Sequence, residues 1–271
     1  MGSLTLIISR LDAYSIGILM FDFAYQLPKS QNMKIHLIDG EKGGVGKSWI
    51  AFVMAEYLAS KLISFYLYAA DRSNPTAASR YKDKKRYAEF YDESVHYTQF
   101  SENIKKIDEP DILLEMASQR TIVLDLPAQV HYPLTSWLEE KDIFALSQAN
   151  QIDWVRWFVC NGEDDSIQIL ITSAEFYKNQ PTVLVRNWGL CDDWEYFDKH
   201  QELQATIKKY RMIVVDFPKL ADSKRIKINA NKWTFDEAME LGNFGIVGKS
   251  DIYQYTKKAY QVLASTQLLE A

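Results

Sequence analysis

Cysteine is nearly absent from this sequence. Its 271 residues include only Cys160 and Cys191, which have no metal-ligand spacing and too few companions for a disulfide framework. The scarcity argues against a cysteine-ligated metal site and against a disulfide-rich secreted scaffold, and it fits a reducing cytoplasm. We expect both thiols to be buried structural side chains.

A strong excess of positive charge is also missing. Lys and Arg number 31 against 36 Asp and Glu, so the net charge is −5 and the molecule as a whole is not a polycation. Any contact with nucleic acid has to come from a local basic patch. No internal repeat or low-complexity linker appears either, and a chain with 47% hydrophobic residues can bury one substantial core, or a core plus a small appendage.

The sequence lacks an uninterrupted apolar run of membrane-spanning length. LTLIISRLDAYSIGILMFDFAYQL, near the N-terminus, comes nearest, but Arg10, Asp12 and Asp22 interrupt it and no basic flank precedes it. We interpret residues 1–32 as an N-terminal extension, either an extra packed helix or a start upstream of the native one. The second interpretation is favoured, because Met33 directly precedes the first strand-like run, and residues 1–32 are then dispensable.

Strand-like and helix-like runs alternate along the rest of the chain. Helical spacing covers KSWIAFVMAEYLASKL (47–62) and a shorter run, PDILLEMASQ. The strand-like runs are MKIHLID (33–39), ISFYLYAA (63–70), TIVLDLP (121–127), IDWVRWFVC, PTVLVRNW and MIVVDFP. This alternation indicates βαβ units, so we predict one α/β domain over 33–271, with a mostly parallel twisted sheet flanked by helices on both faces. Right-handed crossovers would place the ligand-binding loops along one edge of that sheet.

A glycine-rich loop follows the first predicted strand, in HLIDGEKGGVGKSWI (36–50). It nearly matches the phosphate-loop pattern G-x-x-x-x-G-K-[ST]: Gly46, Lys47 and Ser48 are in place, but Glu41 stands where the first glycine belongs. Backbone N–H groups of such a loop, with the N-terminus of the following helix, cradle phosphates. Lys47 would contact the β- and γ-phosphates of ATP, and the Ser48 hydroxyl would ligate Mg²⁺. The alternative is a tight glycine turn with an exposed lysine.

A second lysine, Lys42, precedes the glycine pair. The segment resembles the deviant Walker A loop of the ParA/MinD ATPases, K-G-G-x-x-K-[ST], in the complete match Lys42-Gly43-Gly44-Val45-Gly46-Lys47-Ser48. The resemblance implies a P-loop NTPase fold and an ATP-sandwich homodimer, in which Lys42 reaches the partner's nucleotide. It also implies that Trp49, next in sequence, belongs to the nucleotide site. The alternative for Lys42 is a solvated loop charge.

Two aspartates complete the catalytic part of the resemblance. In YAADRSNPT, Asp71 matches the family residue that orients the attacking water, whereas Ala69 stands where a first Asp is usual. Asp125, in TIVLDLP, matches the Walker B aspartate that contacts Mg²⁺ through water. Lys42, Lys47 and Asp71 are therefore the expected catalytic residues, and capping of a helix or turn is the alternative for each aspartate.

The residues expected to contact adenine lie further along the chain. Asn187, at the end of VLVRN, matches a base-reading Asn of the family, and Pro218 and Lys219 match a segment that packs beside adenine. A plain turn residue is the alternative for Asn187.

The C-terminal third contains the chain's densest basic runs. In ParA-type relatives, basic residues of this half bind the DNA backbone without sequence preference, an interaction that weakens with salt. A solvated face is the alternative. The candidates for DNA binding are Lys208, Lys209, Arg211, Lys224, Arg225, Lys227 and Lys232. The last helix-like run offers only Lys257 and Lys258 as a basic pair, so it is expected to pack on the body and not on a membrane.

The leading hypothesis from the sequence is a short ParA-like ATPase of a plasmid or other mobile element, without an operator-reading domain of its own. It would be a slow, cytoplasmic, nucleoid-associated ATPase whose ATP-bound dimer holds nonspecific DNA and positions or segregates cargo. A ParB-like or adaptor partner would stimulate hydrolysis. The alternatives are an amidoligase or synthetase, a conjugative mobilisation accessory ATPase, and a nucleotide-gated adaptor.

Overall fold

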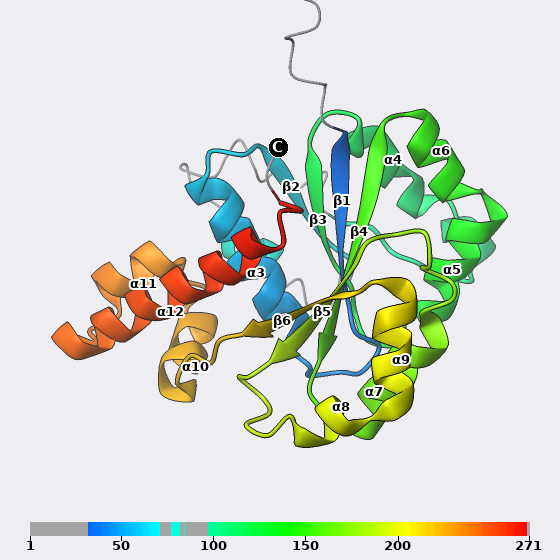
Figure 1. Ribbon diagram of the computed structural model, residues 1–271. Coiled ribbons are helices and arrows are strands. Elements are labelled where there is room, and N and C mark those ends of the chain that lie inside the picture. The colour runs from blue at the N-terminus through cyan, green and yellow to red at the C-terminus, as the bar shows by residue number, and fades with distance from the viewer. Residues whose placement is uncertain (1–31, 71–76, 82–83, 85–96, 270–271) are drawn as a thin grey trace, which may run out of the picture. The chain divides into compact units, whose positions relative to one another are not determined.

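Short runs of β-branched and aromatic residues form the sheet, as expected for strands buried on both faces. The computed structural model describes residues 32–70, 77–81, 84 and 97–269. Its strands pair in the order β2-β3-β1-β4-β5-β6, and every pair is parallel (Figure 1). They are β1 (Met33–Asp39), β2 (Phe65–Ala69), β3 (Thr121–Asp125), β4 (Ile152–Cys160), β5 (Thr182–Asn187) and β6 (Ile213–Phe217). The predicted parallel α/β sheet is confirmed.

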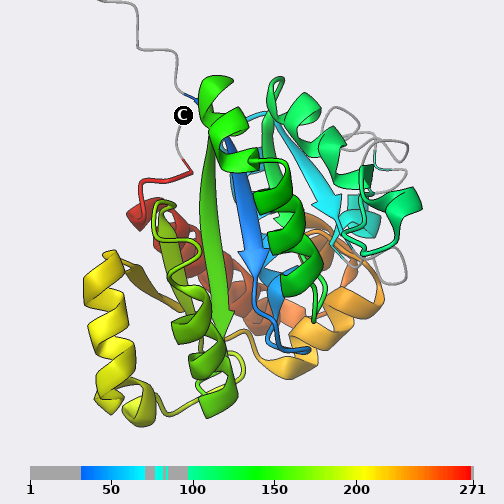
Figure 2. The same ribbon diagram turned by 90° about the vertical axis from the view of Figure 1, so that its right-hand side faces the viewer.

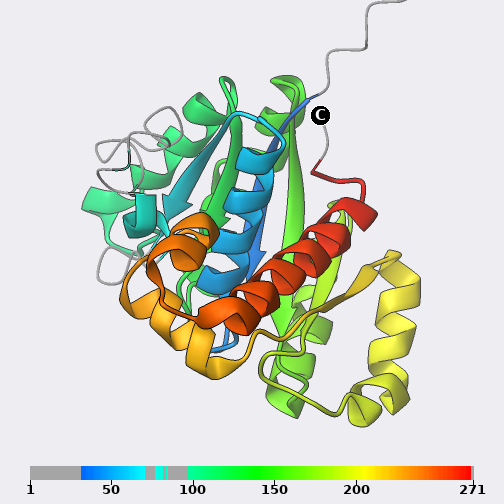
Figure 3. The same ribbon diagram turned by 90° about the vertical axis from the view of Figure 1, so that its left-hand side faces the viewer.

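Helices cover both faces of this sheet. Figure 3 shows the face covered by the first helix after β1 and by the C-terminal helices. These are α3 (Lys47–Ser60), α10 (Asp222–Ala230), α11 (Phe235–Leu241) and α12 (Gly245–Ser265). Figure 2 shows the opposite face, covered by α4 (Ile112–Ala117), α5 (His131–Glu140), α6 (Ile143–Ala149), α7 (Asp164–Ser173), α8 (Glu195–Lys199) and α9 (Gln201–Tyr210). In the described part of the chain, the short 3₁₀ helices are η1 (Ala78–Tyr81), η3 (Ile104–Lys106) and η4 (Glu109–Asp111).

The alternation of side chains along the strands divides the core between the two faces. On β4, Val155 and Trp157 pack on the α3 side, whereas Trp154 packs on the other side. Helix α3 lies between the sheet and α12, and its residues from Ile50 to Leu58 are all buried. This burial fixes the helix that begins directly after the glycine-rich loop, and with it the position of the loop.

The C-terminal helix α12 packs on the body, as expected. It buries one apolar side, which includes Ile252, Tyr255 and Leu263. No helix among the described residues is long and apolar enough to cross a membrane. The chain divides into two units after Asn32, and all the elements named here belong to Met33–Ala271.

Both cysteines are free thiols, but their surroundings differ. Cys160 is fully buried at the end of β4. Cys191 is only half-buried, and its Sγ donates to the carbonyl of Asp193 at 2.8 Å. The expectation of a buried thiol is thus met by Cys160 and is wrong for Cys191, which follows β5 in a loop.

His36 gives the fold an acid-sensitive point. It is fully buried on β1, and its Nδ1 accepts a hydrogen bond from Trp157 Nε1 at 3.1 Å. Burial, and secondarily Lys34, lowers the pKa of His36 from 6.5 to about 3. Between these two pKa values the unfolded chain binds a proton that the folded chain excludes. The contribution of neutral His36 to stability is therefore fully present above the unfolded pKa and is lost as the pH falls below it.

We expect the free energy of unfolding to fall by about 2 kcal/mol between pH 7 and pH 5 because of His36. The loss amounts to about 1.4 kcal/mol per pH unit once the pH is below the pKa of His36 in the unfolded chain. His36→Gln keeps an acceptor for Trp157 but has no proton to bind in this range. Urea unfolding of the parent and of this variant at the two pH values measures the difference. An equal loss in both proteins would show that His36 does not set the acid sensitivity.

Candidate phosphate-binding site

Three glycines with positive φ shape the loop between β1 and α3. They are Gly40 at +150°, Gly44 at +80° and Gly46 at +100°. A Cβ on Gly40 would lie 2.9 Å from the carbonyl oxygen of Val159, and one on Gly46 would lie 2.5 Å from Asn187 Nδ2. A Cβ on Gly44 would meet nothing within 4 Å. The loop therefore needs glycine for its turns, and beside Gly44 it leaves open space.

Lys47 is held inside the loop. Its side chain is buried, and Nζ donates to the carbonyls of Gly40 and of Lys42, the latter at 3.0 Å. Burial lowers the pKa of Lys47, and the carboxylates of Asp39, Asp125 and Glu41 oppose that shift. The backbone N–H groups of Lys47 and Ser48 precede the first helical hydrogen bonds of α3, which Trp49 and Ile50 donate to the Gly46 carbonyl at 3.1 and 3.0 Å. A cation and helix N–H groups thus converge on one loop, which is the arrangement that binds phosphate.

The loop opens into a cavity of about 310 Å³. Ser48 and Trp49 line it together with Asp125, the last residue of β3 and itself buried. Ala69, at the end of β2, lies in the same wall. The structure thus brings the two predicted metal-contacting residues, Ser48 and Asp125, into one cavity with the loop. Asp71 lies outside the described residues.

Lys42 lies on the outside of the loop, in contrast to Lys47. Its side chain is 33% exposed, and Nζ forms ion pairs with Glu163 and, at 2.8 Å, with Asp165. The hydrogen bonds that Lys42 donates to Asp165 and Glu163 raise the pKa of Lys42, and they lower the pKa of each carboxyl group. Both acids lie at the start of α7. No sequence motif connects these acids with the loop.

Glu41, which replaces the glycine of the ordinary pattern, ties the loop to the segment after β3. Its Oε2 accepts from the backbone N–H of His131 at 3.1 Å, and its carbonyl accepts from that of Gln129 at 3.1 Å. Burial raises the pKa of Glu41, although the His131 hydrogen bond opposes the shift. The glutamate thus connects the loop with α5, a role that the pattern alone did not show.

A buried ion pair supports the base of the loop. Asp39 Oδ1 accepts from the Gly40 N–H at 2.6 Å, and Oδ2 accepts from Arg156 Nε at 2.7 Å. The side chains of Arg156 and Asp39 are 1% and 7% exposed. Arg156 also donates to Ser173 Oγ at 2.8 Å, and its guanidinium lies 4.1 Å from the ring centroid of Tyr177. The sequence signal for such an ion pair is the arginine inside the apolar run IDWVRWFVC, because a buried charge needs a partner.

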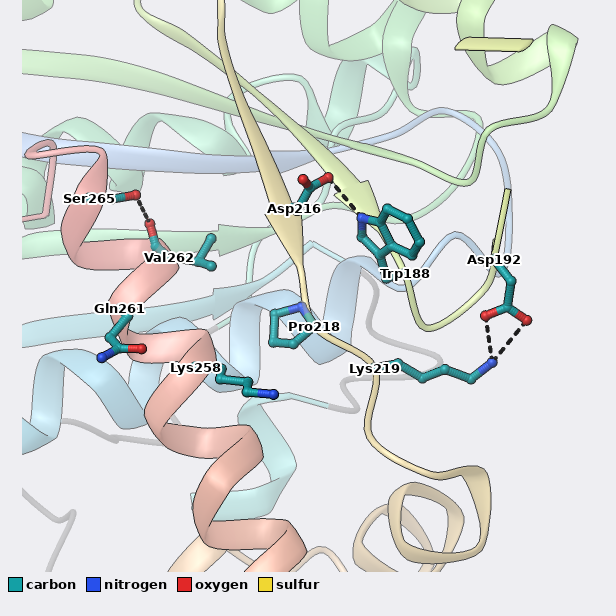
Figure 4. A pocket seen from close by; sticks show the side chains of 9 residues that line it. All are labelled: Trp188, Asp192, Asp216, Pro218, Lys219, Lys258, Gln261, Val262 and Ser265. Atoms are coloured by element: carbon teal, nitrogen blue, oxygen red, sulfur yellow. Dashed lines mark hydrogen bonds and ion pairs between the residues drawn. The ribbon is translucent and has the colours of Figure 1, made fainter. Parts of the chain in front are cut away.

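The residues expected to contact adenine lie in two places. Asn187 is buried against the loop: Nδ2 donates to the Val45 carbonyl at 2.8 Å, and Oδ1 accepts from the Gly189 N–H at 3.0 Å. Pro218 and Lys219 line a separate cavity of about 710 Å³ between β6 and α12, beside Trp188 (Figure 4). In Figure 4, Lys219 points to Asp192, at 2.9 Å. Adenine contact by any of these residues stays a prediction.

The basic residues expected to bind DNA lie on both faces of the sheet. Those at the end of α9 are Lys208, Lys209 and Arg211, and those on or just after α10 are Lys224, Arg225, Lys227 and Lys232. Helix α9 packs with α7, whereas α10 lies on the α3 face of the sheet (Figure 1). The two groups therefore do not form one continuous patch. DNA binding by either group stays a prediction.

Comparison with known proteins gives distant likenesses. No family model matches the chain. It is 22% identical to Protein MobD of Acidithiobacillus ferrooxidans over 231 residues, which are 84% of this chain and 96% of that protein. The MinD cell division protein of Aquifex aeolicus is 13% identical, with a TM-score of 0.46 over 83% of this chain and 95% of that one. A nucleotide-binding protein in complex with ADP from Archaeoglobus fulgidus is 16% identical, with a TM-score of 0.44 over 74% and 86% of the respective chains. Identities and superpositions this low do not assign the chain to a family.

Proposed function

We propose that this chain is an ATPase switch that binds ATP and Mg²⁺ at the glycine-rich loop and dimerises through Lys42. The observation that carries the proposal is the contrast between the two lysines of the loop. Lys47 is buried and faces the loop's own carbonyls, whereas Lys42 is partly exposed and held by acids on its outer side. This contrast supports a role for Lys47 at the chain's own nucleotide and for Lys42 at a neighbouring molecule.

The described residues fit a nucleotide with its metal. Open space beside Gly44, the first turn of α3 and Lys47 supply room, N–H donors and charge for phosphate oxygens. Ser48 and Asp125, the latter through water, would hold Mg²⁺, which neutralises charge on the β- and γ-phosphates. Asp71 would orient the attacking water. The finer roles extend the proposal: a slow ATPase, stimulated by a partner protein, whose dimer binds nonspecific DNA and positions cargo.

A second candidate is an accessory ATPase of conjugative mobilisation. The likeness to Protein MobD, which extends over 84% of this chain, favours it. Both candidates use the same loop and the same dimer, and they differ in the cargo. A requirement for a small-molecule co-substrate would instead support the synthetase alternative.

Phosphate release from ATP by the full chain tests the proposal. We expect slow release that requires Mg²⁺ and that Asp71→Ala abolishes, while this variant still binds ATP. Lys84→Ala is a suitable control, because Lys84 pairs with Glu237 and contacts the Lys232 carbonyl away from the loop. A parent protein that neither binds ATP nor releases phosphate would contradict the proposal.

A further inference from the structure

Helix α10 contributes two side chains to the phosphate cavity. Arg225 and Asn229 line it, together with Asp125 and with the loop residues Gly43, Gly44, Gly46, Lys47, Ser48 and Trp49. Residues four apart lie on the same side of a helix, so one side of α10 faces this cavity. The same cavity is lined by Ser48 and Asp125, which would hold the metal, and by Ala69 at the end of β2.

The position of α10 is fixed by a buried arginine. Arg80 donates to the carbonyls of Ile228 at 3.2 Å and Trp233 at 2.7 Å, and to Asn229 Oδ1 at 2.6 Å. Its guanidinium lies 4.0 Å from the ring centroid of Phe52 on α3. Asn229 Oδ1 accepts from Arg80, which leaves the amide's NH₂ group as its donor, and Arg225 is a cation. The two α10 residues that line the cavity thus both carry hydrogen-bond donors, which suit an anion.

The basic residues of α10 point in different directions. Lys224 pairs with Asp251 of α12 at 3.0 Å, and Lys227 donates to the Gly242 carbonyl at 2.5 Å. Arg225 pairs with Asp222, one turn earlier, at 2.8 Å between Nη2 and Oδ1. The Arg225 and Asp222 side chains are 31% and 60% exposed. An ion pair this exposed is weak, so a more highly charged phosphate can displace the carboxylate.

We propose that Arg225 is a phosphate ligand supplied by the same chain, and that it exchanges Asp222 for the terminal phosphate of ATP. This inference rests on the proposed nucleotide site and adds a residue that distinguishes ATP from ADP. A guanidinium presents paired N–H donors to phosphate oxygens. In the cavity that Ser48 and Asp125 also line, it would meet the γ-phosphate, which ADP lacks. Arg225 thereby belongs to the nucleotide site and not to a DNA-binding surface.

Calorimetric titration of the full chain with Mg²⁺ and either a β,γ-imido ATP analogue or ADP tests this role. We expect Arg225→Gln to lose about tenfold to a hundredfold in affinity for the analogue, the scale of one charge-assisted hydrogen bond, and less than about threefold for ADP. Asp222→Asn should act in the opposite direction, with analogue binding up to about fivefold tighter, because the competing carboxylate is gone.

Lys224→Gln is the matched control: it removes a charge from the same helix on the side that faces α12, and it should change neither affinity. Equal losses for analogue and ADP in Arg225→Gln, or no loss for either, would overturn the assignment to the terminal phosphate. A parent protein that binds neither nucleotide would overturn the nucleotide site itself. Circular dichroism of each variant checks that a lost affinity is not lost folding.

Discussion

Replacing Lys42 by alanine is expected to leave the chain monomeric in ATP, whereas the parent is expected to dimerise. The comparison is best made in an Asp71→Ala background, in which hydrolysis does not deplete the ATP-bound state. Light scattering at saturating ATP and Mg²⁺ should then give the mass of two chains with Lys42 present and of one chain without it. ATP binding to the monomer should persist, because Lys47 is the lysine inside the loop.

The size of this effect follows from two-fold symmetry. Each charge-assisted hydrogen bond across the interface is worth about 1.5–3 kcal/mol, and a symmetric dimer contains two of them. The sum, about 3–6 kcal/mol, overlaps the ~5.5 kcal/mol that changes a 1:99 equilibrium to 99:1. Loss of both bonds therefore suffices to abolish the dimer in light scattering.

Lys141 offers a matched control for Lys42. It is a partly exposed lysine that also pairs with two carboxylates, Asp108 and Asp111, both at 2.6 Å, but it lies on α5's C-terminal side. Lys141→Ala should dimerise like the parent. If Lys42→Ala also dimerises and releases phosphate like the parent, the crossed-lysine mechanism is wrong.

Replacing the two acids that pair with Lys42 should favour the dimer, whereas replacing Lys42 itself should prevent it. A lysine that reaches the partner's nucleotide has to leave Glu163 and Asp165 first. Glu163→Gln with Asp165→Asn should therefore lower the ATP concentration at which half of the protein is dimeric. A higher ATP requirement would indicate that these acids themselves contact the partner.

Replacing Arg156 by alanine is expected to have the largest effect on stability. The change leaves the Asp39 carboxylate buried without its cation, and breaking a buried pair by removing one partner costs about 3–5 kcal/mol. The midpoint of urea unfolding measures this loss. Because Asp39 also accepts from the Gly40 N–H, we expect the variant to bind ATP more weakly as well.

A variant that lacks both charges separates the cost of an unpaired buried carboxylate from the cost of lost side-chain packing. The double variant Asp39→Asn with Arg156→Met leaves no charge at the site of this pair, and methionine is similar in length to the arginine that it replaces. The double variant should therefore recover much of the lost stability. Lys178→Ala, at an exposed pair with Glu175, is the control and should leave the midpoint nearly unchanged. A small effect of Arg156→Ala, equal to that control, would contradict a structural role for the pair.

The sheet could be predicted from sequence because its determinants are local. Each strand is a short apolar run rich in β-branched and aromatic residues, and each structural strand ends within two residues of the predicted run. The glycine-rich loop was recognisable for the same reason: Gly44 and Gly46 adopt positive φ where the pattern needs glycine. Ser48 and Asp125 follow from the loop and from the end of β3.

The contacts that the sequence did not reveal join residues far apart along the chain. Asp39 and Arg156 meet because β1 pairs with β4, and the strand order was not contained in any run of residues. Lys42 meets Glu163 and Asp165 for the same reason, since α7 follows β4. The basic candidates of α10 lie close together in the sequence, but successive residues of a helix point about 100° apart, so Lys224, Arg225 and Lys227 have separate partners.

The most direct test of the crossed lysine is a mixing experiment with two variants that are inactive alone. In the proposed mechanism, Lys42→Ala should bind ATP but has no lysine to donate, and Lys47→Ala can donate Lys42 but should not hold ATP in its own loop. In a mixed dimer the second chain's Lys42 would reach the first chain's nucleotide, so we expect phosphate release well above the sum of the two separate variants. A mixture no more active than that sum, with both proteins folded, would show that Lys42 does not act across the dimer.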